Sequence, residues 1–425
     1  MSNKYVATNG NDETGDGSLF NPWKTINYGY SQLALGNTLY CRGGTYNEYI
    51  TIANGGENES QRKTISNYAS ESVKIDFTGL SGEDHAVEFD YGGVDYITLY
   101  GLEFQNSDHE VGLWTVGDWI ILDHCIFHGL AGAFTHRNGD YLTVRYCESY
   151  GNGNEYHQSN GLTVEDANHV LIEHNYVHDN DTHFGINVYA HPYGWTFNLD
   201  DIVVRYNICH GNVGGHYYRY IVNSYIYDNI VYDSLQDGIY FHRTQGAEHW
   251  DSNSVIYHNT VYGSLLTGLY LNGAGNMTWE NNIFSQNFQT ALEEPPGSTY
   301  YREISILTDE EGHSSDGNVY DPIAENTSKY LIHWGSSGRW NLATCQANGF
   351  ETHGRVSSTP ITDLDFDNVG SKDFHIGTDS IAKEIENDTG ISDDYDGVAR
   401  PQGTYPDAGA YEYKGGLEIA LTFGD

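Results

Sequence analysis

The chain is short of basic residues, and this shortage narrows its possible partners. Its 425 residues include 19 Lys and Arg against 59 Asp and Glu, which gives a formal net charge of −40 at pH 7. A body with this charge repels phosphate backbones, so we expect no nucleic-acid partner. The sequence also contains no run of about 18 apolar residues, which argues against a membrane span and a membrane partner.

Cysteine is scarce as well. The five cysteines are Cys41, Cys125, Cys147, Cys209 and Cys345. An odd number without a CxxC pair favours free thiols over a disulfide framework or a zinc knuckle. The sequence also lacks HExxH and similar metal-binding spacings, so a transition-metal enzyme is disfavoured.

The chain does contain an internal repeat, which extends from about residue 93 to 295. The first repeated pattern is a strand-like run that ends in another apolar pair: IILDHCIF (120–127), LTVRYCES (142–149), VLIEHNYV (170–177), IVVRYNIC (202–209), SYIYDNIV (224–231), SVIYHNTV (254–261) and MTWENNIF (277–284). When these runs are aligned, one column contains Cys125, Cys147, Asn175, Asn207, Asn229, Asn259 and Asn282. A short period with variable insertions is typical of the coils of a parallel β-helix.

The second repeated pattern is a glycine followed by alternating residues. Its copies are GLWTV (112–116), GAFTH (132–136), GLTVE (161–165), GINVY (185–189), GHYYR (215–219), GIYFH (238–242) and GLYLN (268–272). Both patterns are rich in β-branched and aromatic residues with period two, which is typical of strands. A single strand of this kind cannot bury its inner face, but stacked coils can. The repeats therefore predict an all-β parallel solenoid with a ladder of stacked Asn residues at one corner.

The two ends of the chain carry further motifs. The start contains YVATNGNDETGDGSLFNPWKTI (5–26) and LALGNTLYCRGGTYNEYITI (33–52), and the end contains DFHIGTDSIAKE (373–384) and DYDGVARPQGTYPDAGAYEY (394–413). These segments resemble the opening and closing segments of right-handed parallel β-helix proteins of the carbohydrate-active type, including pectate-lyase-like polysaccharide lyases. The resemblance implies one continuous domain, with an N-terminal cap and first coils at 1–80, central coils at 81–297, and C-terminal coils and a closing segment at 298–425.

The resemblance also implies a location and a partner. Proteins of this type act on polysaccharides outside the cell, so we expect an extracellular or periplasmic monomer with a polysaccharide substrate. The N-terminal sequence MSNKYVATNG has no apolar core and is not a signal peptide. Either the protein is intracellular or phage-borne, or the sequence begins after a removed signal, and the residues alone leave both alternatives open.

The alternation of side chains along a strand predicts which residues of the second pattern face outward. Positions one and three after the glycine are mostly apolar and are assigned to the core. Position two holds Trp114, Phe134, Thr163, Asn187, Tyr217, Tyr240 and Tyr270; position four holds Val116, His136, Glu165, Tyr189, Arg219, His242 and Asn272; Arg137, Asp166 and Arg243 follow. This basic and aromatic strip on an acidic body predicts a site for an anionic polysaccharide.

Elimination on a uronic acid needs a cation for the carboxylate, a base for the C5 proton and an acid for the leaving oxygen. We predict that Arg219 is the cation, His242 or Tyr189 the base and Tyr240 the acid, with His136 also in the catalytic set. The predicted substrate-binding residues are Arg137, Arg243, Glu165, Asn187, Tyr217, Tyr270, Trp195 and Trp250. No Lys occurs between Lys74 and Lys329, so the repeats cannot supply a lysine base.

Two other functions stay open at this stage. A glycoside hydrolase needs two carboxylates about 5–10 Å apart. The candidates are Glu165, Asp166, Asp237, Glu248 and Asp251. The third reading is a non-catalytic glycan-binding β-helix. We expect that no cofactor is required, although Ca²⁺ could bind near DNDT (179–182) or LDD (199–201).

Overall fold

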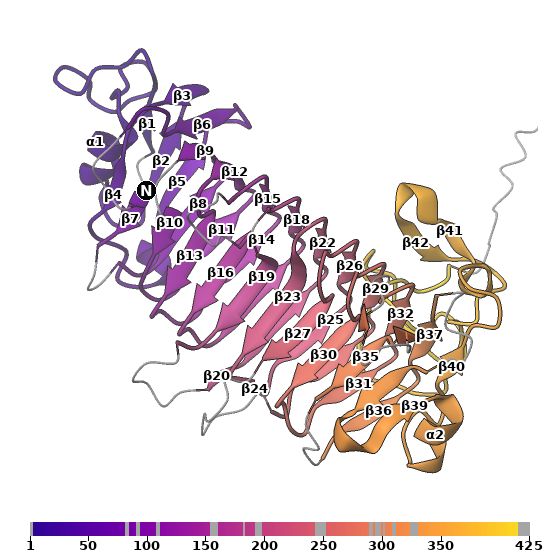
Figure 1. Ribbon diagram of the computed structural model, residues 1–425. Coiled ribbons are helices and arrows are strands. Elements are labelled where there is room, and N and C mark those ends of the chain that lie inside the picture. Colours follow the sequence, from indigo (N-terminus) through magenta and orange to yellow (C-terminus); the bar gives the residue numbers. More distant parts are fainter. Residues whose placement is uncertain are drawn as a thin grey trace, which may run out of the picture.

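Three long parallel sheets run along the molecule and wind into a parallel β-helix (Figure 1). The structure is a computed structural model. It describes residues 3–80, 85–90, 94–107, 111–153, 160–181, 183–191, 198–242, 252–288, 292–293, 299–300, 302–307, 312–323 and 330–414. Within these residues each of the three sheets has twelve strands, so the prediction of an all-β solenoid is confirmed.

The strands are named by sheet. Sheet I contains β1 (Lys4–Val6), β2 (Thr38–Cys41), β5 (Lys63–Asn67), β8 (Ile97–Tyr100), β11 (Ile121–Asp123), β14 (Thr143–Arg145), β17 (Val170–Glu173), β21 (Ile202–Arg205), β25 (Tyr225–Tyr227), β28 (Val255–Tyr257), β31 (Thr278–Glu280) and β36 (Ser314–Asp316). Sheet II contains β3 (Gly44–Tyr46), β6 (Val73–Asp76), β9 (Glu103–Ser107), β12 (Ile126–Leu130), β15 (Glu148–Tyr150), β18 (Tyr176–His178), β22 (Ile208–His210), β26 (Ile230–Tyr232), β29 (Thr260–Tyr262), β32 (Ile283–Ser285), β37 (Val319–Asp321) and β40 (Arg355–Val356). Sheet III contains β4 (Ile50–Ile52), β7 (His85–Phe89), β10 (Val111–Thr115), β13 (Phe134–Arg137), β16 (Leu162–Glu165), β19 (Phe184–Tyr189), β23 (Gly214–Arg219), β27 (Ile239–His242), β30 (Leu269–Asn272), β35 (Ile304–Ile306), β38 (Ile332–Trp334) and β39 (Gly338–Trp340).

Each coil contributes one strand to each sheet, in the order I, II, III. The first repeated pattern supplies the strands of sheets I and II, and the second supplies those of sheet III. Neighbouring coils pair in parallel, except for the antiparallel β39 at the C-terminal end of sheet III. The remaining elements are small: α1 (Ile26–Ser31), α2 (Leu342–Ala347), β20 (Leu199–Asp200), β24 (Ile221–Val222), β33 (Leu292–Glu293), β34 (Thr299–Tyr300), β41 (Phe366–Asn368) and β42 (Asp373–Ile376). In the part of the chain that the structure covers, no helix has the length and apolarity that crossing a bilayer requires.

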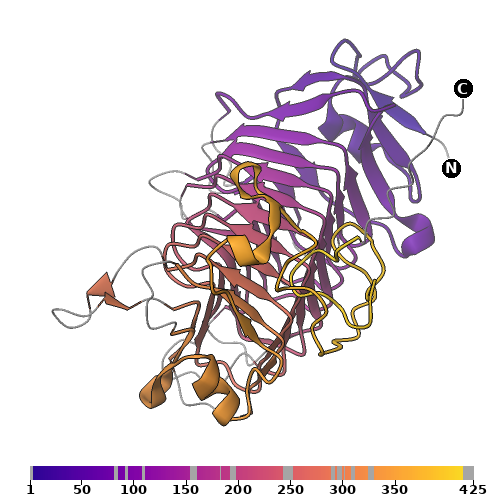
Figure 2. The ribbon, with the colours of Figure 1, turned by 90° about the vertical axis from the view of Figure 1, so that its right-hand side faces the viewer.

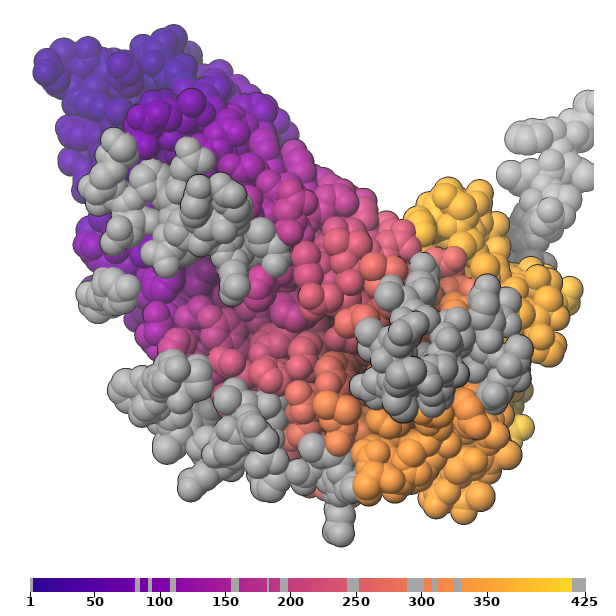
Figure 3. Space-filling view, viewed as in Figure 1, coloured from indigo at the N-terminus to yellow at the C-terminus, as the bar shows by residue number. Residues whose placement is uncertain are grey.

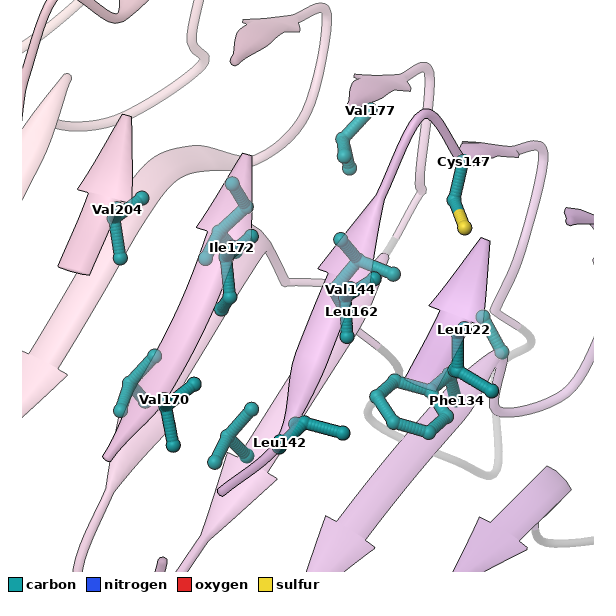
Figure 4. Packing of buried hydrophobic residues seen from close by; sticks show 14 of the residues in the cluster. Leu122, Phe134, Leu142, Val144, Cys147, Leu162, Val170, Ile172, Val177 and Val204 are labelled. Carbon is teal, nitrogen blue, oxygen red and sulfur yellow. The ribbon is translucent and has the colours of Figure 1, made fainter. Parts of the chain in front are cut away.

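The core is a continuous apolar column inside the coils. Every second residue of each strand points inward, so equivalent residues of successive coils stack. Figure 4 shows Leu122, Val144 and Ile172 of sheet I at equivalent positions in this core, near Phe134 and Leu162 of sheet III. This packing fixes the direction of the outward side chains of sheet III.

The predicted Asn ladder is confirmed at the corner between sheets I and II. The amide of Asn175 donates to Oδ1 of Asn207 at 2.9 Å, and the same bond recurs through the later coils. The ladder comprises Asn175, Asn207, Asn229, Asn259, Asn282 and Asn318. It ends at Glu351, whose carboxylate accepts from the amide of Asn318 at 2.8 Å. Burial raises the pKa of Glu351 to about 7.

A second Asn ladder, which the sequence patterns did not reveal, lies between sheets II and III. Asn152 donates to Asn180 at 3.0 Å, and Asn180 donates to Asn212 at 2.9 Å. These residues are fully buried and lie before β16, β19 and β23. Because they fix the turn that enters sheet III, they help to position the central strands of that sheet.

All five cysteines are buried and free. The prediction of free thiols, rather than a disulfide framework, is therefore confirmed. Cys125 and Cys147 occupy adjacent coils at the N-terminal end of the first Asn ladder, where the backbone N–H of Cys147 donates to Asn175.

The C-terminal segment lies along the side of the coils, as the yellow trace in Figure 2 shows. Arg400 of this segment is buried and pairs with Asp228 of the coils at 2.8 Å and with Glu412 at 3.0 Å. Asn387 of the same segment donates to Asn281 at 3.2 Å. These bonds explain why the closing motif carries a buried arginine and several acids.

Candidate functional site

The outer face of sheet III carries two adjacent rows of side chains. The strand register defines the first row as Thr163, Asn187, Tyr217, Tyr240 and Tyr270, and the second as Arg137, Glu165, Tyr189 and Arg219. His242 follows on β27, the strand next to that of Arg219, and pairs with Asn272. Because neighbouring strands lie about 4.8 Å apart, the rows form one continuous strip. The coils around this strip form one unbroken body in the space-filling view (Figure 3).

His136 does not belong to this strip, and the prediction that it faces outward is wrong. The register pairs Phe134 with Leu113 and His136 with Val164, so both side chains point into the core. One extra residue, Ala133, follows the glycine of this coil, and a slip of one residue reverses every side chain of a strand. His136 is fully buried and shares hydrogen bonds with Thr115 (2.9 Å) and with the carbonyl of Gly139 (2.7 Å). Burial lowers its pKa to about 4, so the ring is a neutral core residue.

Arg219 is the cation at the centre of the strip. Its Cζ lies 5.1 Å from the ring centre of Tyr189, and its Nη2 donates to the carbonyl of Ala190 at 3.3 Å. Its Nε is buried without a hydrogen-bond partner. Among the residues that the structure describes, no carboxylate forms an ion pair with Arg219, so the guanidinium has donors left for a ligand.

His242 lies beside this cation and is held by Tyr217. The Tyr217 hydroxyl and Nδ1 of His242 share a hydrogen bond of 2.7 Å. Burial, together with the charge of Arg219, lowers the pKa of His242. The imidazole is therefore neutral at neutral pH and can accept a proton.

Aromatic rings continue the strip towards the C-terminal coils. Tyr217 lies perpendicular to Tyr240, with ring centres 5.4 Å apart, and Tyr240 stacks on Tyr270 at 4.7 Å. Phe184 packs against Tyr217 at 4.6 Å. Burial raises the pKa of Tyr240, and it raises that of Tyr270 to about 12, so both hydroxyls are protonated at neutral pH.

At the N-terminal end of the strip, Glu165 forms a cluster with two neighbouring side chains. Its carboxylate accepts from the Tyr189 hydroxyl and lies 3.4 Å from Nε of Arg137. Burial and the charge of Glu165 raise the pKa of Tyr189. The Tyr189 hydroxyl is therefore protonated at neutral pH and cannot accept a proton there as His242 can, and Glu165 is already bonded to its two neighbours.

The other predicted carboxylates lie apart from this cluster. Asp237 is buried and accepts from the N–H of Thr267 at 3.0 Å and from its hydroxyl at 2.6 Å; burial raises its pKa. Asp166 accepts from the backbone N–H of His191 at 2.7 Å. Each of these acids already has a structural role. Five further predicted site residues lie outside the described residues: Arg243, Trp195, Trp250, Glu248 and Asp251.

A hollow of about 350 Å³ opens on the strip beside Arg219. It is lined by Asn160, His183, Phe184, Asn187, Tyr189, His191, Tyr217 and Arg219. The sequence patterns did not reveal Asn160, His183 and Phe184, because the second pattern begins at its glycine and these residues precede that glycine. The two residues directly before Gly185 would have been the signal, since β19 begins at Phe184.

Two other hollows are less suited to an anionic ligand. One of about 450 Å³ includes Asp118, Asp140 and Asp166 beside Arg137, so acids outnumber bases among its charged lining residues. The other, of about 600 Å³, lies on sheet I around Arg205, which already donates to Glu173 and to Tyr227. The hollow at Arg219 is therefore the best candidate site.

Metal ligands do not gather around these hollows. Over the described ranges, no three His, Cys, Asp or Glu side chains come close enough to hold a metal ion. The region DNDT (179–182) includes the undescribed Thr182. Asp200 accepts from Asn223, and Asp201 pairs with His169. Asp200 and Asp201 thus both have protein partners.

Comparison with known proteins identifies the coil type. Residues 4–161 match the family of Pel9A-like right-handed β-helix regions, and residues 195–299 match a general right-handed β-helix region. No curated protein matches the chain by sequence. The predicted right-handed fold is thus confirmed.

Solved structures show the same fold at low sequence identity. XylC in complex with xylose is 11% identical with a TM-score of 0.60, covering 96% of this chain and 98% of that protein. Pectate lyase Pel9A is 14% identical with a TM-score of 0.57, covering 97% of each chain. A glycoside hydrolase is 10% identical with a TM-score of 0.52, and the match covers 75% of this chain and 96% of the hydrolase chain.

Proposed function

Because the chain is a right-handed parallel β-helix protein with a Pel9A-like region, we propose that it is a polysaccharide lyase acting on an acidic, uronate-containing polysaccharide. The observation that carries the proposal is the grouping of Arg219, neutral His242 and Tyr217 along one face, beside a hollow. In the described part of that face, Glu165 is engaged by Tyr189 and Arg137 rather than paired with a second acid.

The groups match the three needs of β-elimination. Arg219 binds the C6 carboxylate and stabilises the negative charge that develops when the C5 proton leaves. His242 takes that proton, and Tyr217 orients its ring through Nδ1. The C4–O bond then breaks as the C4–C5 double bond forms. Tyr240, protonated because burial raises its pKa, donates a proton to the leaving oxygen.

The surroundings suit a sugar chain. Phe184, Tyr217, Tyr240 and Tyr270 offer aromatic surface along the strip, while Arg219 supplies local positive charge on a body of −40. An anionic polymer is therefore favoured at this strip and repelled elsewhere. Since the similarly folded Pel9A is a pectate lyase, polygalacturonate is the first substrate to try.

The test compares two arginine variants on this polymer. Arg219→Met should lower kcat/KM by about 100-fold or more, because one preorganised charge contact to the transition state is lost. Arg205→Met removes a similar surface arginine from sheet I and should leave the activity unchanged. If Arg219→Met keeps full activity, or if Glu165→Gln and not Arg219→Met abolishes it, the lyase proposal is wrong.

A further inference from the structure

Asn187 has an unusual environment for a buried polar residue. It lies in the middle of β19 and is only 6% exposed, yet its Oδ1 has no hydrogen-bond partner. A buried acceptor without a partner is costly to a fold, so its position needs an explanation. Asn180 of the nearby ladder is the contrasting case, because its amide donates to Asn212 and to the carbonyl of Ser149.

The position of Asn187 connects its unpaired acceptor to the candidate site. The register places it directly beside Tyr217, and both line the hollow that contains Arg219. Tyr217 is engaged with His242, and Nη2 of Arg219 with Ala190. Asn187 therefore lines a space, close to a cation, in which a ligand can supply a hydrogen-bond donor.

We propose that Asn187 is a specificity residue that accepts a hydrogen bond from a free hydroxyl of the sugar whose carboxylate Arg219 binds. This inference rests on the proposed function. A hydroxyl can donate, whereas an O-acetyl group cannot and is also larger. A site built to bond a hydroxyl rejects an analogue that lacks it, because its own buried polar group stays unpaired. The substrate class is thus a uronate polymer with that hydroxyl unsubstituted.

The first arm of the test measures stability. Asn187→Leu replaces the unpaired amide with an apolar side chain of similar size, so the melting temperature should stay equal or rise. Asn180→Leu is the matched control, since the same change in the bonded ladder should lower the melting temperature. If Asn187→Leu lowers it as much as Asn180→Leu does, Asn187 is a structural residue and the proposal is overturned.

The second arm measures selectivity without turnover. Calorimetry compares galacturonate oligomers with and without O-acetyl groups, binding to His242→Ala, which lacks the proposed base, and to His242→Ala that also carries Asn187→Leu. His242→Ala alone should prefer the unsubstituted oligomer by at least about 10-fold, and the double variant should bind both alike. Asn187→Ala provides a second variant in case the leucine side chain disturbs the strand. An unchanged preference in the variants, or binding of neither oligomer, overturns the inference.

The two proposals can fail separately. If the oligomers bind with the expected preference but no unsaturated product forms, the lyase proposal fails and the hydroxyl-reading role stands. If product forms while acetylated and unsubstituted polymers react equally well, the lyase proposal stands and the role of Asn187 is overturned.

Discussion

At the scale of single residues, the proposed elimination requires that His242 is a neutral base beside a fixed cation. Burial disfavours its charged form, and the guanidinium of Arg219 repels it, so both effects lower the pKa. A lowered pKa extends the neutral, base-competent form to more acidic pH. The acid limb of kcat/KM should therefore have an apparent pKa below the ordinary histidine value of 6.5.

The cause of this shift can be tested by titrating the ring. In Arg219→Met the repulsion is removed, so the pKa of His242 should rise relative to the native chain, as followed by NMR. His375 on β42 serves as an internal reference whose titration should not move. A fall in the His242 pKa, or an equal shift at both histidines, would contradict the proposed contact.

Much of the site could be predicted from the alternation of residues alone. Asn187, Tyr217, Arg219, Tyr240 and His242 all lie on the outer face, as the period of two predicts. The predicted outward direction of His136 was wrong, because a sequence pattern that starts at the glycine cannot show that Ala133 shifts the register. It also could not show which acids are engaged, since Glu165 is bonded by residues on neighbouring coils.

At the scale of secondary-structure elements, the turns are held by stacked amides. Asn229 donates to the carbonyl of Val204 at 2.8 Å and to Asn259 at 3.0 Å, and it accepts from Asn207 at 3.0 Å. Each such residue thus bonds across neighbouring coils, which links the stacking of the strands to the geometry of the corner. The first ladder was predictable because its residues occupy one sequence column. The second was hidden by variable insertions between sheets II and III.

Interrupting the first ladder should destabilise the coils without altering the site. Asn229→Ala leaves buried partners unpaired, so the free energy of unfolding should fall by about 1–3 kcal/mol. Urea unfolding followed by circular dichroism measures this loss. Cys125→Ala changes a residue of the same column that has no side-chain amide, so it should lower the free energy of unfolding by less. Equal losses in the two variants would mean that the ladder adds nothing beyond packing.

At the scale of the whole molecule, the C-terminal segment is fastened to the middle of the coil stack. Arg400 pairs with Asp228 of the coils and with Glu412 of its own segment, and all three are buried. Burial raises the pKa values of both acids, and the charge of Arg400 opposes that rise. The closing motif therefore acts as a clamp between segments that are 172 residues apart.

Removing the clamp should loosen this segment first. Arg400→Met leaves two buried acids uncompensated, which should cost about 3–5 kcal/mol of stability. Hydrogen exchange should become faster in 394–412, while sheet III keeps its protection. If exchange rises uniformly or does not change, the ion pair does not fasten the segment.

The most direct test of the proposed lyase activity is the chemistry of the products. The purified chain is incubated with polygalacturonate, with and without EDTA, while ultraviolet absorbance and new reducing ends are followed together. If the chain is a lyase, the absorbance of unsaturated uronate rises in step with the reducing ends, and Arg219→Met lowers both rates by about 100-fold or more. New reducing ends without any rise in absorbance would contradict the lyase proposal, because the bond would then have been broken by hydrolysis.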